Sequence, residues 1–193
     1  GLVTLDKDDN VIRPAILWND GRTGEETEYL NTVIGKDKLS QYTANIAFAG
    51  FTAPKILWMQ KNEPENFKKV VKIMLPKDYL AYRLSGSFCT DVSDASGMQL
   101  LDVPKRQWSD ELLEILDIDK SLLAKVYESP EVTGTILPEI AAKTGLSTSM
   151  TPELIDEKVA SLSCKAAVKG NNRLSAQEVD KLIGELLTPV SYT

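Results

Sequence analysis

The chain of 193 residues contains no histidine, and this absence removes the most common general base and the most common zinc ligand. It also excludes the Ser-His and Cys-His arrangements that activate nucleophiles. Acid-base chemistry in this sequence would therefore fall to carboxylates or lysines.

Cysteines, long apolar runs and phosphate-binding loops are equally scarce. The two cysteines, Cys89 and Cys164, lie far apart, and no signal-like segment opens the chain, so we expect a cytoplasmic protein with reduced thiols. No apolar run approaches the roughly 20 residues that span a bilayer, so we expect no membrane segment. Neither a GxxxxGKS/T nor a GxGxxG motif is present to bind a phosphate.

The composition is that of a globular protein, with 42% apolar and 26% charged residues. The net charge of -6 argues against nucleic acid or an anionic membrane as the main partner. The chain opens with "GLVTLD", which lacks an initiator Met and already resembles a strand. We therefore expect a fragment of a longer protein.

Strand-like and helical patterns alternate over residues 1–146, which predicts an α/β fold. Leu2–Leu5 and Val11–Trp18 are typical of a β-hairpin, and residues 90–97 of a polar loop. Thr52 is placed to cap a helix that runs to Pro64. Further helices are expected over residues 22–34 and 65–71, after Pro76, Ser109 and Pro138, and glycines at 35, 86 and 145 are expected to end three of them.

After Gly145 the pattern changes to a linker at residues 147–151 and an α-helical hairpin at 152–193. The second predicted helix begins at a capping box, Ser175–Glu178. Its apolar face suggests a module for partner docking or homo-oligomerisation, although packing of this face on residues 1–146 is slightly favoured. The face comprises Val179, Leu182, Ile183, Leu186 and Leu187.

The turn Trp18-Asn19-Asp20-Gly21-Arg22 is the most informative polar cluster, because it ends an apolar run. An indole can stack on the C–H face of a sugar, while an amide, a carboxylate and a guanidinium bond its hydroxyls. The alternative is a strand end with a capped helix start and a local contact between Asp20 and Arg22. The residue types alone leave both interpretations open and slightly favour the second.

Two further polar clusters have simpler explanations. Lys77 and Asp78 could bind a substrate oxygen, but a surface pair that opens a helix is more common. Asp91, Ser93 and Asp94 could hold a metal or a polyol, but they do not match the calcium-loop pattern. A turn stabilised by its own Asp and Ser side chains is the more common use of such residues.

Six motifs carry a resemblance to a known family through their order and spacing. Residues 1–146 resemble the N-terminal domain of the FGGY carbohydrate kinases and, within that family, the xylulokinases. The motifs are "RPAILWNDGR" from 13, "GFTAPKILWM" from 50, "MLPKDYLAYRLSG" from 74, "TDVSDASGM" from 90, "LLDVPKRQWS" from 100 and "VTGTILPEIAAKTGL" from 132.

The resemblance implies part of an actin-like (ribonuclease H-like) domain, one of two domains around a cleft in the whole protein. It implies a reaction in which ATP, with magnesium, phosphorylates D-xylulose to D-xylulose 5-phosphate. It places Trp18, Asn19, Asp20 and Arg22 at the sugar site, and so favours the ligand interpretation of this turn. To Lys77, Asp78, Asp91, Ser93 and Asp94 it gives mainly a structural role beside the cleft.

Two departures from the family pattern concern catalysis. The chain begins after the family's DxGT-type phosphate motif, and "STSMTPE" stands where the family has a GGGD-like turn with its acceptor-activating aspartate. We therefore expect a piece that is inactive alone, with a partial sugar site that binds weakly, without a catalytic residue, a metal site or a cofactor of its own.

Residues 151–187 are similar instead to part of the C-terminal domain of the MutL mismatch-repair proteins. "SCK" at 163–165 corresponds there to a cysteine-containing motif near a metal site. The other ligand-bearing segments of that family are missing, so a mismatch-repair nuclease fragment is the least favoured alternative.

Overall fold

The computed structural model describes residues 1–149 of the 193. Within these residues the chain forms two compact units. The first unit contains Gly1–Tyr79 and Cys89–Ser129, and the second contains Leu80–Phe88 and the residues from Pro130 onward. The helical hairpin predicted at 152–193 and the resemblance to MutL expected at 151–187 both concern residues outside this described part.

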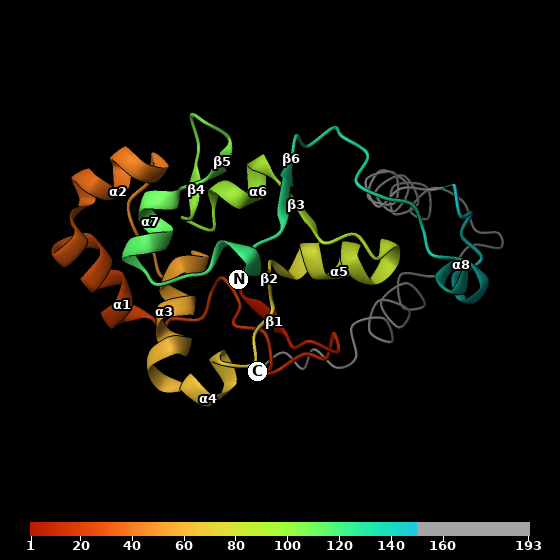
Figure 1. The fold of residues 1–193 in the computed structure, drawn as a ribbon, viewed down its shortest axis with the longest axis horizontal. Coiled ribbons are helices and arrows are strands. Elements are labelled where there is room, and N and C mark those ends of the chain that lie inside the picture. The colour runs from red at the N-terminus through yellow and green to blue at the C-terminus, as the bar shows by residue number, and fades with distance from the viewer. Residues whose placement is uncertain (150–193) are drawn as a thin grey trace, which may run out of the picture. The chain divides into compact units, whose positions relative to one another are not determined.

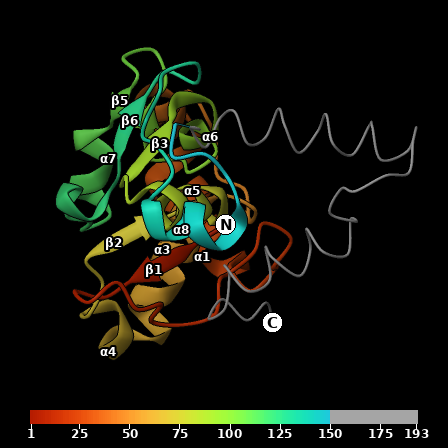
Figure 2. The same ribbon diagram turned by 90° about the vertical axis from the view of Figure 1, so that its right-hand side faces the viewer.

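The first unit contains short strands that confirm the α/β class. β1 (Val3–Leu5) pairs antiparallel with β2 (Lys72–Met74), and the two lie side by side in both views of the ribbon (Figures 1 and 2). β3 (Cys89–Asp91) pairs parallel with β6 (Lys125–Tyr127). A small antiparallel pair joins β4 (Leu101–Asp102) to β5 (Gln107–Trp108).

Isolated bridges extend these pairs into a larger arrangement. Ile73 of β2 bridges in parallel to Leu123, two residues before β6 begins. The segment Leu123–Tyr127 therefore links the β1–β2 pair to the β3–β6 pair, so that parallel and antiparallel neighbours occur together. Val3 and Met74, which face each other across the β1–β2 pair, are both buried.

The predicted hairpin between Leu2–Leu5 and Val11–Trp18 is present only in part. Antiparallel bridges join Leu2 to Ile16 and Leu5 to Val11, but the second segment forms no continuous strand. The regular partner of β1 is β2, which is distant in sequence. Local alternation of apolar residues could not reveal this pairing, because it depends on where the helices between the two strands return the chain.

Helices pack around these strands. In the first unit they are α1 (Gly24–Tyr29), a π-helical turn at Leu30–Gly35, α2 (Lys36–Thr43), α3 (Thr52–Asn62), α4 (Pro64–Phe67), the start of α5 (Pro76–Ser85), α6 (Val92–Ser96), α7 (Asp110–Ile115) and a 3-10 turn at Lys120–Leu122.

The helices predicted after Pro76, Ser109 and Pro138 are confirmed, but other expectations need correction. The helix expected over residues 65–71 ends at Phe67, and α2 follows Gly35 directly although the sequence predicted no helix there.

Ser109 caps α7, accepting a hydrogen bond from the Leu112 amide at 3.3 Å. Thr52 does not cap α3; it is the first helical residue, and its hydroxyl donates to the Gly1 carbonyl at 3.0 Å. Residues 90–97 are not a loop, because they contain the end of β3 and the whole of α6, which Asp91 caps.

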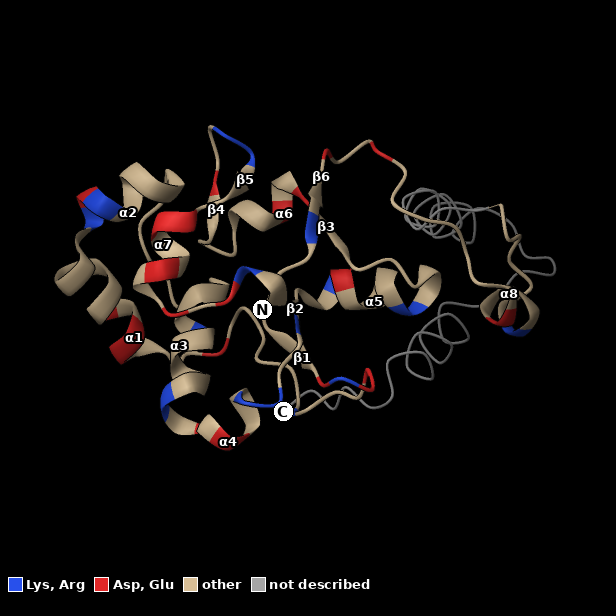
Figure 3. Ribbon diagram, in the orientation of Figure 1, with Lys and Arg blue, Asp and Glu red and all other residues tan. Residues whose placement is uncertain are grey.

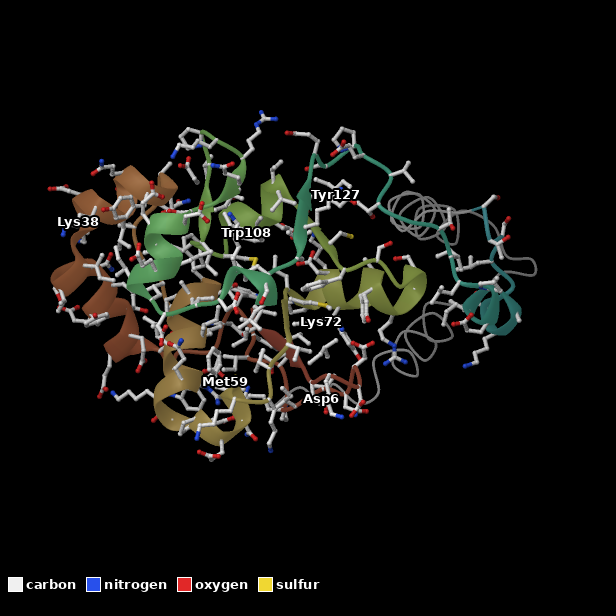
Figure 4. The ribbon with its side chains drawn as sticks, in the orientation of Figure 1. Asp6, Lys38, Met59, Lys72, Trp108 and Tyr127 are labelled. Atoms are coloured by element: carbon white, nitrogen blue, oxygen red, sulfur yellow. The ribbon has the colours of Figure 1, made fainter. Side chains whose placement is uncertain are left out.

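The core of the first unit lies between the strands and the helices. Leu5, Ile16, Leu39 and Ile56 have no exposed surface, and burial of each such side chain contributes roughly 1.5–3 kcal/mol. Trp108, labelled in Figure 4, is also buried, and its indole N–H donates to the Ala124 carbonyl at 2.8 Å. The buried polar end of this ring is therefore satisfied.

The second unit contains the rest of α5 and α8 (Pro138–Thr144). Leu84, Ile136 and Ile140 form its small apolar cluster. Gly145 ends α8 with a φ of 70°, as its position in the sequence predicted. Within residues 1–149, no helix combines the length and the apolar character of a membrane span.

Candidate functional site

The turn at Trp18–Arg22 follows a buried segment but is itself open to solvent. Ala15 and Ile16 are buried, whereas Trp18 exposes 75% of its surface. A tryptophan exposed to this degree forgoes most of the stabilisation that burial of an indole provides. Its ring is therefore available for stacking on a ligand.

Asp20 and Arg22 form a tight ion pair at the end of this turn. Arg22 Nε donates to Asp20 Oδ1 at 2.9 Å and to Oδ2 at 3.0 Å, while Nη2 donates to Oδ2 at 2.7 Å. The Arg22 amide also donates to Oδ1, at 3.0 Å. The side-chain hydrogen bond from Arg22 lowers the pKa of Asp20, and the same bond raises the pKa of Arg22. The local contact expected from the sequence is thus present.

Helix α3 supports this ion pair from behind. The Arg22 guanidinium lies 4.8 Å from the centre of the Trp58 ring, and the Arg13 guanidinium lies 5.7 Å from the same ring. Such cation–π contacts contribute about 0.5–1 kcal/mol at partly exposed sites. Arg13 is in turn held by Glu63, with Nε 3.0 Å from Oε2. Arg22 is therefore held in place by the Asp20 carboxylate and by the Trp58 ring.

A loop that the sequence did not single out packs against the same turn. A Cβ added at Gly50 would lie 3.1 Å from the Trp18 carbonyl oxygen, so the two backbones approach closely. The Ala49 carbonyl accepts hydrogen bonds from Lys55 Nζ and from Thr23 Oγ1, the latter at 3.3 Å. Thr23 directly follows the turn, so its hydrogen bond to Ala49 connects this loop to the turn.

Lys55 is fully buried, which is rare for a lysine. Burial lowers its pKa; the charge of Asp20 acts in the opposite direction, and that of Arg22 adds to the lowering. One feature of the sequence could have indicated that Lys55 is buried. Lys55 lies among small and apolar residues in "GFTAPKILWM", where a solvated lysine is out of place.

The second cluster is organised around the ammonium group of Lys77. Its Nζ lies 3.1 Å from Asp78 Oδ1 and 3.4 Å from Asp94 Oδ2, and it contacts Asp91 Oδ1. Burial opposes the charged form, but the charge of Asp78 and the contacts with Asp91 outweigh it and raise the pKa of Lys77. The ammonium group thus neutralises carboxylates that would otherwise repel one another.

Asp78 is a buried helix cap rather than one partner of a surface pair. It exposes 2% of its surface, and its Oδ2 accepts the Leu75 amide at 3.1 Å, three residues back. This is the reciprocal half of a capping box at the start of α5. Burial raises the pKa of Asp78, while the charge and hydrogen bond of Lys77 act in the opposite direction. Lys77 and Asp78 therefore pair at the start of a helix as expected, but the Asp78 side chain is buried rather than on the surface.

Asp91 and Ser93 are engaged in local structure. Asp91 Oδ2 accepts the Ser93 amide at 3.0 Å and the Ser129 hydroxyl at 2.7 Å. Burial acts to raise the pKa of Asp91, but the hydrogen bonds from Lys77 and Ser129 outweigh it, and the net direction is downward. Within residues 1–149, no group of three acidic, cysteine or histidine side chains is placed to hold a metal ion.

Residues of both charge signs are spread along the elements of the first unit (Figure 3). A hollow of about 230 Å³ lies between α1 and α3. It is lined by Glu25, Glu26, Tyr29, Leu57 and Lys61, none of which the sequence predicted as a site residue. Lys61 Nζ lies 2.7 Å from Glu25 Oε2 across it.

Comparisons with known proteins place this arrangement in a family. Residues 1–162 match the N-terminal domain of the FGGY family of carbohydrate kinases. The chain is 45% identical over 148 residues to the xylulose kinase of Escherichia coli, covering 77% of this chain and 30% of that protein. It is 47% identical over 142 residues to the xylulose kinase of Lactococcus lactis, covering 74% and 28%.

Solved structures agree with the sequence relatives. A xylulose kinase from Brucella ovis superposes with a TM-score of 0.71 at 39% identity, covering 76% of this chain and 30% of that one. A ligand-bound xylulose kinase from Lactobacillus acidophilus superposes with a TM-score of 0.73 at 26% identity, covering 78% and 31%. The chain spans about 30% of the length of the curated relatives named here. It belongs to the FGGY family of carbohydrate kinases and represents part of their N-terminal domain, with the actin-like α/β fold.

Proposed function

We propose that the chain is the sugar-holding part of a xylulokinase-like enzyme, and that the turn at Trp18–Arg22 contacts the ketose. The exposure of Trp18 beside an immobilised ion pair carries this proposal. The whole protein would transfer the terminal phosphoryl group of ATP to D-xylulose. The names of the relatives support this choice of sugar.

The side chains of the turn have complementary roles in this proposal. The Trp18 indole stacks on the C–H face of the sugar, which excludes water from one side of it. The Asn19 amide can donate hydrogen bonds to sugar hydroxyl groups and accept them, whereas the ionised Asp20 carboxylate only accepts them. Arg22 holds Asp20 ionised and oriented, so that the carboxylate needs little reorganisation when the sugar binds.

Phosphoryl transfer also needs metal-clamped phosphates and an oriented acceptor. The carboxylates of Asp78, Asp91 and Asp94 do not fit a magnesium site in the described part of the chain, because the Lys77 ammonium already lies among them. ATP and magnesium therefore enter only the proposed reaction of the whole protein, and no step through them is derived from these residues.

Isothermal titration of the chain with D-xylulose tests the proposal. We expect a Kd on the order of 1 mM or weaker, because only part of a binding site contributes. Glycerol, which lacks a ring or extended face for stacking, serves as the matched control ligand and should give no heat. Absence of heat with D-xylulose up to tens of millimolar would contradict the assignment.

A phosphorylation assay with ATP, magnesium and D-xylulose completes the test. We expect no turnover from this chain, because Asp20, the carboxylate of the turn, is paired with Arg22 and its lowered pKa makes it a poor base for the acceptor hydroxyl. A turnover that disappears in Asp20→Asn would show that the chain contains a complete catalytic site and would overturn the assignment of Asp20 to binding alone.

A further inference from the structure

Helices α1 and α3 border a small hollow that the proposed sugar site does not use. Its volume of about 230 Å³ is below the roughly 300–1,000 Å³ of sites for drug-sized ligands. Glu25, Glu26 and Tyr29 line it from α1, and Leu57 and Lys61 line it from α3. Leu57 and Lys61 are four residues apart and therefore share one face of their helix. The hollow thus suits a ligand about as large as a single side chain.

Glu26 is the unusual residue of this hollow, because its carboxyl group is buried without a hydrogen bond to either oxygen in the described part of the chain. The residue exposes 6% of its surface, and Oε2 has no hydrogen-bond partner. Oε1 lies 3.8 Å from Lys61 Nζ, which is beyond hydrogen-bond distance. Leaving a buried acceptor unsatisfied is destabilising, so a donor that entered the hollow and reached Glu26 would remove this cost.

Lys61 is bound to the other carboxylate of the hollow instead. Its Nζ donates to Glu25 Oε2 at 2.7 Å, and both of these side chains are largely exposed. The lining therefore contains two carboxyl groups and one ammonium group, and the carboxyl group left without a close partner is the buried one, that of Glu26. A ligand that carries a positive charge would balance the lining.

The remaining lining residues favour an organic cation over a metal ion. Leu57 and the ring of Tyr29 offer carbon surface, against which an alkyl stem can pack while its charged end contacts the carboxyl group. Magnesium and calcium need several oxygen ligands. The hollow offers two carboxyl groups and a lysine, and no group of three acidic, cysteine or histidine side chains within residues 1–149 could hold a metal.

We propose that this hollow binds a primary alkylammonium group, with Glu26 as the hydrogen-bond acceptor and with Leu57 and Tyr29 packed against the alkyl stem. Lys61 limits the affinity, because its own ammonium group lies close to the same carboxyl group. A free amine and a lysine side chain of another protein present the same chemical group, and the choice of probe separates these two sources. The site does not depend on sugar binding, so either proposal can fail while the other stands.

Titration with n-butylammonium chloride at pH 7, followed by NMR shifts of the amides at 25–29 and 57–61, tests the site. We expect a Kd on the order of 1–10 mM for the wild-type chain and no binding of 1-butanol, which has the same stem without the charge. Glu26→Gln should weaken the binding of n-butylammonium at least about tenfold, because a charge-assisted hydrogen bond is lost. Glu28→Gln, which removes an exposed carboxylate from the same helix, is the matched control and should leave it unchanged.

Binding of n-butylammonium no tighter than that of 1-butanol, or equal binding by the wild-type chain and a folded Glu26→Gln, would overturn the proposal. Lys61→Met provides a second test that does not depend on the folding of Glu26→Gln. Because it removes the competing ammonium group from an exposed position, we expect n-butylammonium to bind about fivefold more tightly, and unchanged or weaker binding would contradict the site.

Nα-acetyl-lysine amide identifies the source of the ammonium group. Binding as tight as that of n-butylammonium would assign the hollow to a lysine side chain of another protein, and at least tenfold weaker binding would assign it to a free amine, because the peptide groups would then be excluded from the hollow.

Discussion

The Trp18–Arg22 turn and the Lys77 cluster are alike in sequence but opposite in structure. Each places charged residues directly after an apolar run. In the Lys77 cluster the carboxylates of Asp78 and Asp91 turn inward onto the lysine and onto backbone amides. In the turn, the ion pair is complete, yet Trp18 remains three-quarters exposed beside it.

The difference shows at which of the two sites the binding of a ligand can be favourable. A cluster whose charges already neutralise one another has little to gain from a ligand, because binding must first break existing hydrogen bonds. An exposed aromatic ring next to an immobilised ion pair gains by being covered. Substitutions at the two sites should therefore separate a cluster that stabilises the fold from a turn that binds.

The largest effect is expected for Asp78→Ala. Removing a buried carboxylate that caps α5 and pairs with Lys77 should lower the free energy of unfolding by about 3 kcal/mol. Urea denaturation measures this change. Asp94→Ala is the matched control, since Asp94 is largely exposed and its loss should cost less than about 0.5 kcal/mol. Equal effects of the two variants would contradict the buried capping role.

Trp18→Ala is expected to show the opposite behaviour. Because the ring contacts solvent, the free energy of unfolding should change by less than about 0.5 kcal/mol. The affinity for D-xylulose should fall about tenfold, as measured by calorimetry, because stacking is lost. Val33→Ala, at another exposed apolar position, should change neither quantity. A Trp18→Ala chain that is strongly destabilised but binds normally would remove the turn from the site.

Alkaline pH should distinguish the buried Lys55 from the partly exposed Lys77. The pKa of Lys55 is lowered in the folded state, so between that pKa and about 10.4 the unfolded chain holds the extra proton. Raising the pH from 7 to about 10 should therefore stabilise the wild-type chain relative to Lys55→Met. Asp20 and Arg22 keep their charges over this range, because their pKa values are lowered and raised respectively.

Lys77 should not show this dependence. Its pKa is raised in the folded state, so its contribution to stability is fully present below about pH 10.4 and is lost only above that value. The deficit of Lys77→Met relative to wild type should thus stay constant from pH 7 to about 10. Urea denaturation at several pH values measures both variants, and parallel behaviour of the two would show that their environments are not distinct.

The smallest effect is expected for Ser93→Ala. Asp91 accepts the backbone amide of Ser93, which the substitution preserves, so stability should change by less than about 0.5 kcal/mol. The affinity for D-xylulose should also be unchanged. A weaker affinity measured by calorimetry would mean that the Lys77 cluster reaches the sugar, and the contrast between the two clusters would then be lost.

Several features of the protein follow from the sequence alone, because their physical causes are local. The Ser109 cap of α7, the positive φ of Gly145 after α8 and the contact between Asp20 and Arg22 each involve residues within a few positions of one another. The order and spacing of the motifs along residues 13–146 likewise indicate the family.

Only the tertiary structure decided the features that join distant residues. The pairing of β1 with β2 and the burial of Lys55 beneath the Ala49 carbonyl arise when segments far apart in the chain pack together. Burial then decides the chemistry. The same kinds of charged residue form a network of ion pairs around Lys77 and support an exposed aromatic ring at Trp18, because packing buries Asp78 and leaves the Trp18 ring in solvent.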